Sequence, residues 1–313
     1  MRKTFILFST SAAKRLTFKQ RSKFINYIGG ELLKNNIECS ADKYSNRIDK
    51  EMSLVVGNLK TAKKIIVAGY DTPRKILFSK FIYHPLDWEK NRKQEKKNII
   101  IVLIISIIAT IICGLGIYYL KYVTKNIRLI LYALIVIVMI LVVKLNKGYA
   151  NFYNFNKNTG GITVLFKLAQ YVNVSSRKTA YVFLDNTAEG YKGYERLKEL
   201  LDKFNNKNPQ LIILDCIAEG ENIYVAFNEK KELNNSTLIK SLSNYFDLKI
   251  LKLNDEEYNK SPLSLYSNGI MIFRGKESNG EYIVENTRTK EDSQCDIDQL
   301  NNIYLALSDF IKK

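Results

Sequence analysis

Two long apolar runs interrupt a chain whose hydrophobic and polar positions otherwise alternate. Residues 98–120 contain no charged side chain, and residues 127–145 contain only Arg128 and Lys144, close to the two ends. A helix rises about 1.5 Å per residue, so each run can cross the apolar core of a bilayer, which is about 30 Å thick. Arg128 and Lys144 are long enough to bring their charges to the interfaces. The two runs, joined by residues 121–126, predict a transmembrane hairpin.

The remaining chain alternates short β-like runs with segments of helical periodicity. The predicted strands are 53–59, 64–68, 179–184, 211–214 and 222–227. The predicted helices are 12–36, 162–172, 190–205 and 298–311. This alternation is typical of an α/β sheet that is covered by helices on both faces. We therefore divide the chain into the first part of an α/β domain (1–97), the transmembrane hairpin (98–145) and the second part of that domain (146–313).

Charge predicts how the hairpin is oriented. Residues 80–97 carry six Lys and Arg side chains and residues 144–160 carry three more, against three at the turn of the hairpin. The positive-inside rule places both termini and the α/β domain in the cytoplasm, with two spans in the cell membrane. The first ten residues contain only four consecutive apolar side chains, too few for a signal peptide. The bilayer is thus the first expected partner.

Composition excludes other functions. The formal net charge is +17, but the basic residues are scattered and form no nucleic-acid-binding motif, so we expect no nucleic-acid partner. The four cysteines form no C-x-x-C pair, which indicates free thiols in a reducing compartment. His84 is the only histidine, so a mechanism that needs two imidazoles is excluded.

Five segments, taken in order, resemble the di-zinc aminopeptidase family, which shares its fold with transferrin-receptor and nicastrin-like relatives. IIVAGYDTP (65–73) is similar to the family's strand ending in H-x-D, and NKNTGGITVLFKLAQ (156–170) to its D-N-x-S/T-G turn. TAYVFLDNTAEGYKGYERL (179–197) resembles the strand that ends in two glutamates, and LIILDCIAEG (211–220) the strand with a ligand aspartate. NTRTKEDSQCDIDQLNNI (286–303) resembles the block around the last histidine, H-T-x-x-D. The resemblance implies a zinc-exopeptidase-like mixed sheet flanked by helices and interrupted by the hairpin.

Carried over residue by residue, the resemblance implies that the metal centre is lost. Non-ligands stand at the metal and general-base positions: Gly69, Lys157, Thr187, Ala188 and Arg288. Only Asp71 and Asp215 are retained among the expected ligands. Zinc is bound by imidazole, thiolate or carboxylate groups, and a hydrolytic water needs a base. We therefore expect no catalytic residue, no metal and no cofactor, and interpret the chain as a pseudoenzyme. His84 lies outside every motif and is interpreted as an interfacial or turn residue.

Cation–carboxylate pairs are a physical substitute for the lost metals. Our hypothesis is that Lys157 and Arg288 pair with Asp71 and Asp215, and with Asp185 as a further candidate, and so hold the former active-site loops. The alternative is that these are ordinary exposed side chains.

Three functions stay open. The first is a membrane-anchored, inactive aminopeptidase-like protein that binds a peptide or a partner membrane protein, in a peptide export or maturation system. The second is an active metallo-aminopeptidase whose zinc is bound by Asp71, Asp215 and either Glu189 or Glu219. The third is a transport accessory that acts through the hairpin, although Ser106, Thr110 and Tyr132 suit helix packing better than a polar path.

Overall fold

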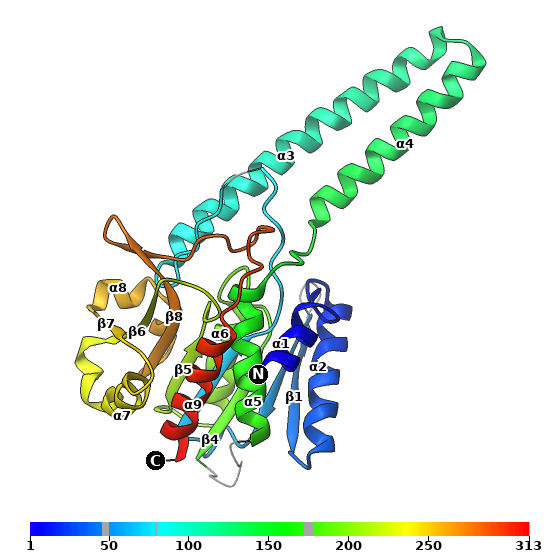
Figure 1. Ribbon diagram of the computed structural model, residues 1–313. Helices are drawn as coiled ribbons and strands as arrows, with labels where there is room; N and C mark the ends of the chain where they lie inside the picture. The colour runs from blue at the N-terminus through cyan, green and yellow to red at the C-terminus, as the bar shows by residue number, and fades with distance from the viewer. Residues whose placement is uncertain (46–49, 79, 172–177, 313) are drawn as a thin grey trace.

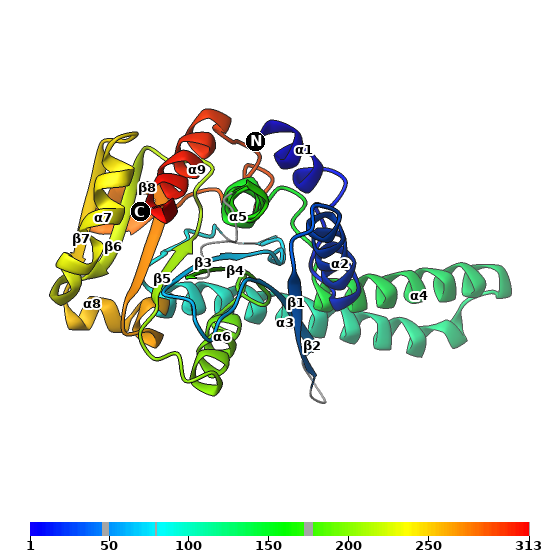
Figure 2. The same ribbon diagram turned by 90° about the horizontal axis from the view of Figure 1, so that it is seen from below.

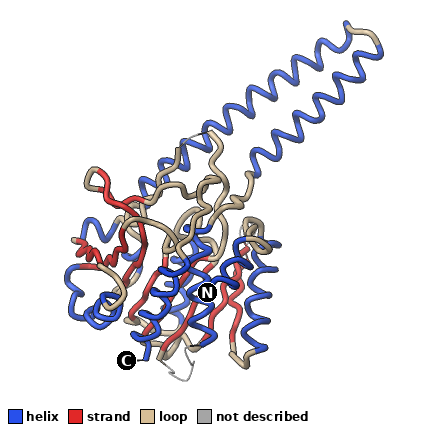
Figure 3. The backbone as a smooth tube through the Cα atoms, in the orientation of Figure 1, coloured by secondary structure: helices blue, strands red, loops and turns tan. Residues whose placement is uncertain are grey.

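The computed structural model describes residues 1–45, 50–78, 80–171 and 178–312, which form one nine-stranded mixed sheet flanked by helices (Figures 1 and 3). The strands are β1 (Cys39–Ser45), β2 (Lys50–Val56), β3 (Lys64–Gly69), β4 (Thr179–Leu184), β5 (Gln210–Leu214), β6 (Asn222–Asn228), β7 (Leu248–Leu253), β8 (Gly269–Ser278) and β9 (Glu281–Ile283). Their order is β1-β2-β4-β3-β5-β8-β6-β7, and β9 pairs with β8. Strands from both sides of the hairpin thus share one sheet, and the predicted fold class is confirmed.

The centre of the sheet is parallel, because β3 runs parallel to both β4 and β5, and β5 runs parallel to β8. Alternate side chains of β3 enter different cores: Ile66 and Ala68 face one, and Ile65 and Val67 face the other. Both cores exclude water, which explains why the central strands are continuous apolar runs.

Helices cover the two faces as the alternation predicted (Figure 2). The first core packs under α1 (Arg2–Ser9), α2 (Phe18–Lys34), α5 (Gly160–Tyr171), α7 (Glu232–Ser243) and α9 (Ile297–Lys312). The second packs under α6 (Lys192–Lys203) and α8 (Asp255–Asn259). The helix predicted from residue 12 begins instead at Phe18, because Thr17 and Gln20 form a capping box there.

The hairpin projects away from the sheet as two long antiparallel helices (Figure 1). They are α3 (Trp88–Tyr119), followed by a short 3-10 turn (Leu120–Tyr122), and α4 (Lys125–Lys147). Both are long and apolar enough to span a membrane. The first helix begins at Trp88, before the predicted span 98–120, because the side chain of Asp87 caps it by accepting from Lys90 N. The basic segment 88–97 is therefore helical.

The segments before and after the hairpin pair at one place, which we call the hairpin root (residues 73–75 and 149–151). Beyond the root the chain still contacts the domain through Ile76, Tyr83 and Trp88. Arg74 and Ala150 form an antiparallel bridge at the root. Lys75 N donates to Tyr149 O (2.7 Å), and Asn151 N donates to Pro73 O (3.0 Å). The hairpin is thus attached through a short, hydrogen-bonded piece of two-stranded structure.

Candidate functional site

The retained and replaced residues converge at the carboxyl ends of the parallel strands. Asp71 follows β3, Thr187 and Ala188 follow β4, and Asp215 follows β5. Lys157 lies in the turn that precedes α5. The carboxyl ends of parallel strands meet at one sheet edge, which is where α/β proteins place their sites.

Lys157 and Asp215 form a buried ion pair. The Lys157 ammonium lies 2.8 Å from Asp215 Oδ1 and 2.9 Å from Oδ2, and both side chains are only 4% exposed. Tyr83 covers the pair, because its hydroxyl donates to Asp215 Oδ2 (2.5 Å) while its ring lies 3.7 Å from Lys157 Nζ. Burial first, and then the charge of Asp215, raises the pKa of the Tyr83 hydroxyl well above its usual value, which keeps it a proton donor.

A second buried acid holds the turn that carries Lys157. Asp292 Oδ1 accepts from Asn156 N (2.7 Å), and burial raises the pKa of Asp292 well above its usual range. Asn156 in turn accepts from Ala218 N (2.9 Å) through its side chain. The ammonium of Lys157 is therefore placed by a fixed backbone.

Asp71 is held by neutral donors instead of a cation. Its Oδ1 accepts from Thr187 N (3.0 Å) and from Thr187 Oγ1 (2.9 Å), and its Oδ2 accepts from Ala188 N (3.0 Å). Asn158 donates its side-chain amide to the carbonyl of Asp71. Asp71 thus connects the end of β3 to the loop after β4.

Thr187 also fills the space beside Gly69. A Cβ at Gly69 would lie 1.9 Å from Thr187 Oγ1, and 3.0 Å from Thr187 Cβ. No side chain fits at residue 69 while Thr187 is present, least of all an imidazole. The residues at these two family positions are therefore complementary to each other in shape.

Arg288 has other partners than we expected. Its guanidinium lies 2.5 Å from Glu95 Oε1 and 3.2 Å from Glu189 Oε1, and its Nε donates to Arg74 O (3.0 Å). The hypothesis that Arg288 pairs with Asp71 or Asp215 is wrong in its partners, because the loop after β9 brings Arg288 against α3. Glu95 lies on that helix, so Arg288 joins the degenerate site to the hairpin.

Asp185, the further candidate, lies at the end of β4 and pairs with a different arginine. Arg21 Nε lies 2.9 Å from Asp185 Oδ1, and Met52 N donates to Oδ2 (3.0 Å). Burial and the nearby Asp71 raise the pKa of Asp185 to about 7, and Arg21 opposes this only in part.

Sequence reasoning missed Arg15, which is fully buried beneath the site. It donates to the carbonyls of Tyr70, Phe8 and Ala12 and to Thr159 Oγ1. Burial lowers the pKa of Arg15 to about 9. A lone arginine in a polar N-terminal segment gives no signal of such burial; only the contacts from residues distant in sequence reveal it.

The side chains do not fit a zinc site. Within the described residues, no group of three or more His, Cys, Asp and Glu side chains lies close enough together to hold a metal ion. Both oxygens of Asp215 are engaged by an ammonium, and both oxygens of Asp71 accept backbone or hydroxyl donors. Glu189 pairs with arginine, and Glu219 lines a separate cavity beside Arg274. A metal would have to displace these partners.

His84 and Cys216 offer no alternative catalytic centre. His84 lies in the turn before α3, where its Nδ1 is 3.4 Å from Glu281 Oε2, and burial lowers its pKa. Cys216 is buried beside Asp215, and burial, followed by the charge of that aspartate, raises the pKa of its thiol well above the usual value. A thiol in this state is a poor nucleophile.

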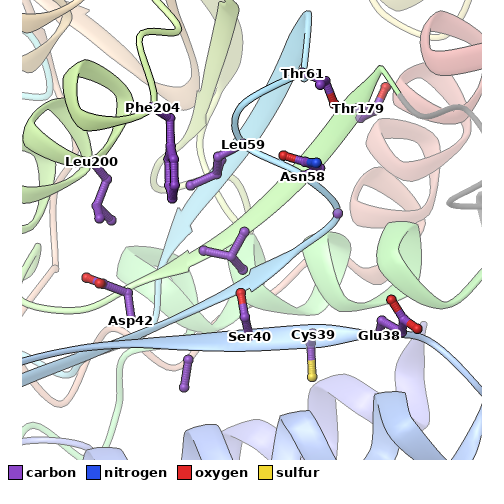
Figure 4. Close-up of a pocket in the computed structure, with 13 residues that line it drawn as sticks. Glu38, Cys39, Ser40, Asp42, Asn58, Leu59, Thr61, Thr179, Leu200 and Phe204 are labelled. Carbon is purple, nitrogen blue, oxygen red and sulfur yellow. The ribbon is translucent and has the colours of Figure 1, made fainter.

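A cavity of about 330 Å³ opens beside Asp71, between α2 and the loop after β4. Its polar lining includes Arg21, Lys50, Asp71, Arg74, Asn186 and Glu189. A larger cavity of about 790 Å³ lies at the far end of the sheet, where Leu59, Leu200 and Phe204 face Ser40 and Asp42 on β1 (Figure 4). None of the predicted site residues lines that larger cavity.

Comparisons with known proteins establish the fold. No family model matches the chain, and no curated protein matches it. Glutaminyl cyclase of Porphyromonas gingivalis superposes with a TM-score of 0.61 at 10% identity, over 100% of this chain and 98% of that one. The LapA aminopeptidase of Legionella pneumophila gives a TM-score of 0.58 at 8% identity, over 99% of this chain and 71% of that one. A leucine aminopeptidase precursor of Bacteroides thetaiotaomicron gives 0.55 at 11% identity, over 99% and 96%. The chain thus has the fold of aminopeptidases and glutaminyl cyclases, the second of which our sequence reasoning did not consider.

Proposed function

We propose that this chain is a membrane-anchored protein with an aminopeptidase-like fold, which binds a peptide or a partner membrane protein without hydrolysing it. The Lys157–Asp215 pair carries the proposal. By the family resemblance, an ammonium stands where a bridging carboxylate is expected, and it occupies both oxygens of the retained aspartate. Positive charge at that point opposes metal binding, and no glutamate base stands at residues 187 and 188.

The hairpin supplies the anchor in this proposal. In this proposal the two helices cross the bilayer; their length and apolar composition support this, and the basic residues that flank them favour a cytoplasmic α/β domain with cytoplasmic termini. A cytoplasmic domain held at the membrane suits a role in peptide export or maturation, where the bound partner is itself at the membrane.

The cavity beside Asp71 is the proposed binding surface. It lies next to Asp71, and the exposed side chains of Lys50 and Arg74 line it, where they can make polar contacts with a peptide. Phe18 lines it and is 37% exposed. Phe204 in the distant larger cavity is 39% exposed, so it provides a matched control.

The first experiment measures metal and activity of the full chain in detergent. After incubation with zinc and desalting, we expect no retained zinc by plasma mass spectrometry. We also expect no release of amino acid from aminoacyl p-nitroanilides and no cyclisation of an N-terminal glutaminyl peptide. Near-stoichiometric zinc with chelator-sensitive turnover would overturn the proposal in favour of an active metalloenzyme.

The second experiment places a photo-crosslinking amino acid at Phe18 or at Phe204 in cells. We expect a specific crosslinked partner from Phe18 and none from Phe204. Equal crosslinking from both positions would contradict the proposed surface. Replacement of residues 98–145 by an unrelated two-span anchor should preserve the Phe18 crosslink; its loss would favour the hairpin as the functional element.

A further inference from the structure

A small cavity at the hairpin root is lined both by apolar side chains of the two long helices and by charged side chains of the domain. Its volume is about 210 Å³. Val102 and Leu103 of α3 and Leu145 of α4 form the apolar side, and Arg74 and Lys75 lie on the charged side. An amphiphile matches such a lining, because its head and its chains need these two environments.

The cations of this cavity are unequally compensated. Arg288 also lines it, but its guanidinium is engaged by Glu95 and Glu189. Among the described residues, the Arg74 side chain forms one ion pair, to Glu189 at 3.6 Å from Nε, and it is 49% exposed. Lys75 forms no ion pair among those residues. The lining thus holds three cations against the carboxylates of Glu95 and Glu189, which leaves one net positive charge, and Arg74 and Lys75 are the cations that these acids engage least.

The side chain of Asn98 is a second, independent observation that points to a ligand in this cavity. Its Oδ1 atom is buried, and no hydrogen-bond donor reaches it among the described residues. Asn98 lines the same cavity. Because a buried acceptor without a donor is destabilising, a ligand that carries a hydroxyl group would satisfy it.

The backbone around the cavity is fixed before any ligand binds. The bridge between Arg74 and Ala150 sets the direction of Arg74. Gly148 ends α4 with φ near +75°, and a Cβ there would lie 2.7 Å from Arg74 Cδ. The absence of a side chain at Gly148 thus lets the arginine stem lie against the end of the helix. Such prior ordering lowers the entropy cost of binding.

We propose that this cavity binds the head group of an anionic phospholipid that carries hydroxyl groups, such as phosphatidylglycerol. The phosphate lies beside Arg74 and Lys75, a head-group hydroxyl donates to Asn98 Oδ1, and the acyl chains follow Val102, Leu103 and Leu145 along the hairpin. This inference rests on the proposed membrane anchoring, and it adds a specific lipid site to it.

The test is native mass spectrometry of the full chain from micelles that contain equal amounts of phosphatidylglycerol and phosphatidylcholine. We expect one retained phosphatidylglycerol in the unmodified protein. Each basic contact near a membrane surface contributes about 1 kcal/mol, so the double variant Arg74→Gln with Lys75→Gln should weaken the preference about thirtyfold. Arg74→Lys should retain most of it, because the charge is kept.

Lys121→Gln with Lys125→Gln is the matched control, since it removes the same charge at the other end of the hairpin. The control should bind phosphatidylglycerol as the unmodified protein does. Asn98→Ala should weaken phosphatidylglycerol binding but leave phosphatidic acid, which lacks the head-group hydroxyls, unaffected.

Two results would overturn the inference: equal retention of the two lipids by the unmodified protein, or equal loss in the control and in the Arg74 and Lys75 variant. Alkaline extraction of membranes separates this failure from that of the anchoring. A chain that resists extraction but shows no lipid preference contradicts the lipid site alone, whereas a chain that is extracted contradicts the anchoring as well.

Discussion

Asp71 and Asp215 are both buried carboxylates at one edge of the sheet, but different groups compensate their charges. Asp215 faces an ammonium at 2.8 Å, whereas Asp71 accepts three hydrogen bonds from the backbone and hydroxyl of the loop after β4. The first arrangement depends on side chains, the ammonium of Lys157 and the hydroxyl of Tyr83. The second depends on the course of the backbone at residues 187–188, so no single side chain removes all of it.

This difference shows two ways in which a buried carboxylate links loops at a sheet edge. Lys157 joins the turn before α5 to β5, while Asp71 joins β3 to the loop after β4. Each link is expected to fail separately, which the following predictions test.

The largest effect is expected for Lys157→Met. The change removes the cation but leaves Asp215 buried, and breaking a buried pair from one side costs about 3–5 kcal/mol of unfolding free energy. The control is Lys198→Met, which breaks an exposed i,i+4 pair with Asp202 (39% and 54% exposed) and should cost less than about 0.5 kcal/mol. Equilibrium unfolding in detergent measures both. Combining Lys157→Met with Asp215→Leu should recover most of the loss. Equal costs for Lys157→Met and for the control Lys198→Met would contradict a stabilising Lys157–Asp215 pair.

A smaller loss is expected for Asp71→Asn. The amide nitrogen of asparagine cannot accept, so either Ala188 N or the Thr187 donors lose their partner. Hydrogen bonds to charged groups contribute about 1.5–3 kcal/mol. The exposed Asp247→Asn serves as the comparison in the same unfolding measurement. If the two variants unfold alike, the three hydrogen bonds to Asp71 contribute nothing measurable.

Gly69→Ala tests the shape complementarity with Thr187. The added methyl group meets Thr187 Oγ1, and overpacking of this kind costs about 1–3 kcal/mol. Gly30→Ala in α2 is the control: nothing lies within 4 Å of its Cβ, so it should stabilise the helix by about 1 kcal/mol or slightly less. In a Thr187→Ala background, Gly69→Ala should cost less than it does alone. Strict additivity of the two changes would show that they do not touch.

The fourth prediction concerns the pH dependence of stability instead of the stability at one pH. Because burial raises the pKa of Asp185 to about 7 from an ordinary value of 3.8, the folded state binds this proton more tightly than the unfolded state does. Asp185 therefore favours folding below pH 4 relative to pH 7, and its contribution falls as pH rises through that window. The slope for one proton is at most about 1.4 kcal/mol per pH unit. Unfolding of Asp185→Asn between pH 4 and 8 should lack this decline. An unchanged slope in the variant would mean that another group titrates.

Some strands of the sheet could be predicted from the sequence, and others could not. Continuous apolar runs identified β3, β4 and β5, and residue order then brought Asp71, Lys157 and Asp215 to one edge. β1 was missed because its side chains are mostly exposed on both faces, which leaves no alternation to detect. β8 was missed because its apolar half continues into the polar segment RGKES.

The partners of Arg288 were beyond sequence reasoning. Glu95 is 193 residues away from Arg288 in the sequence. It lies in a lysine-rich segment that we had used only to predict membrane topology, and no sequence motif marks this one glutamate as a partner of Arg288. The fit of Thr187 against Gly69 is also invisible in a sequence, since it depends on the separation of two loops in space. Residue type and order predicted which residues gather at the sheet edge, but not the partners that Arg288 and Asp71 have there.

The bridge at the hairpin root has a practical consequence for making a water-soluble form. Tyr83, which covers the Lys157–Asp215 pair, lies in the same stretch of chain as the two long apolar helices, between the two strands of the bridge. Excising everything between those strands would therefore remove Tyr83, which covers the ion pair, together with helices α3 and α4. A shorter excision, joining Lys97 to Asn146 by a flexible linker, keeps Tyr83 in place. Asn146 donates to Ser106 Oγ, which lies eight residues beyond Asn98 on α3, so the linker has to span about 12 Å of helix.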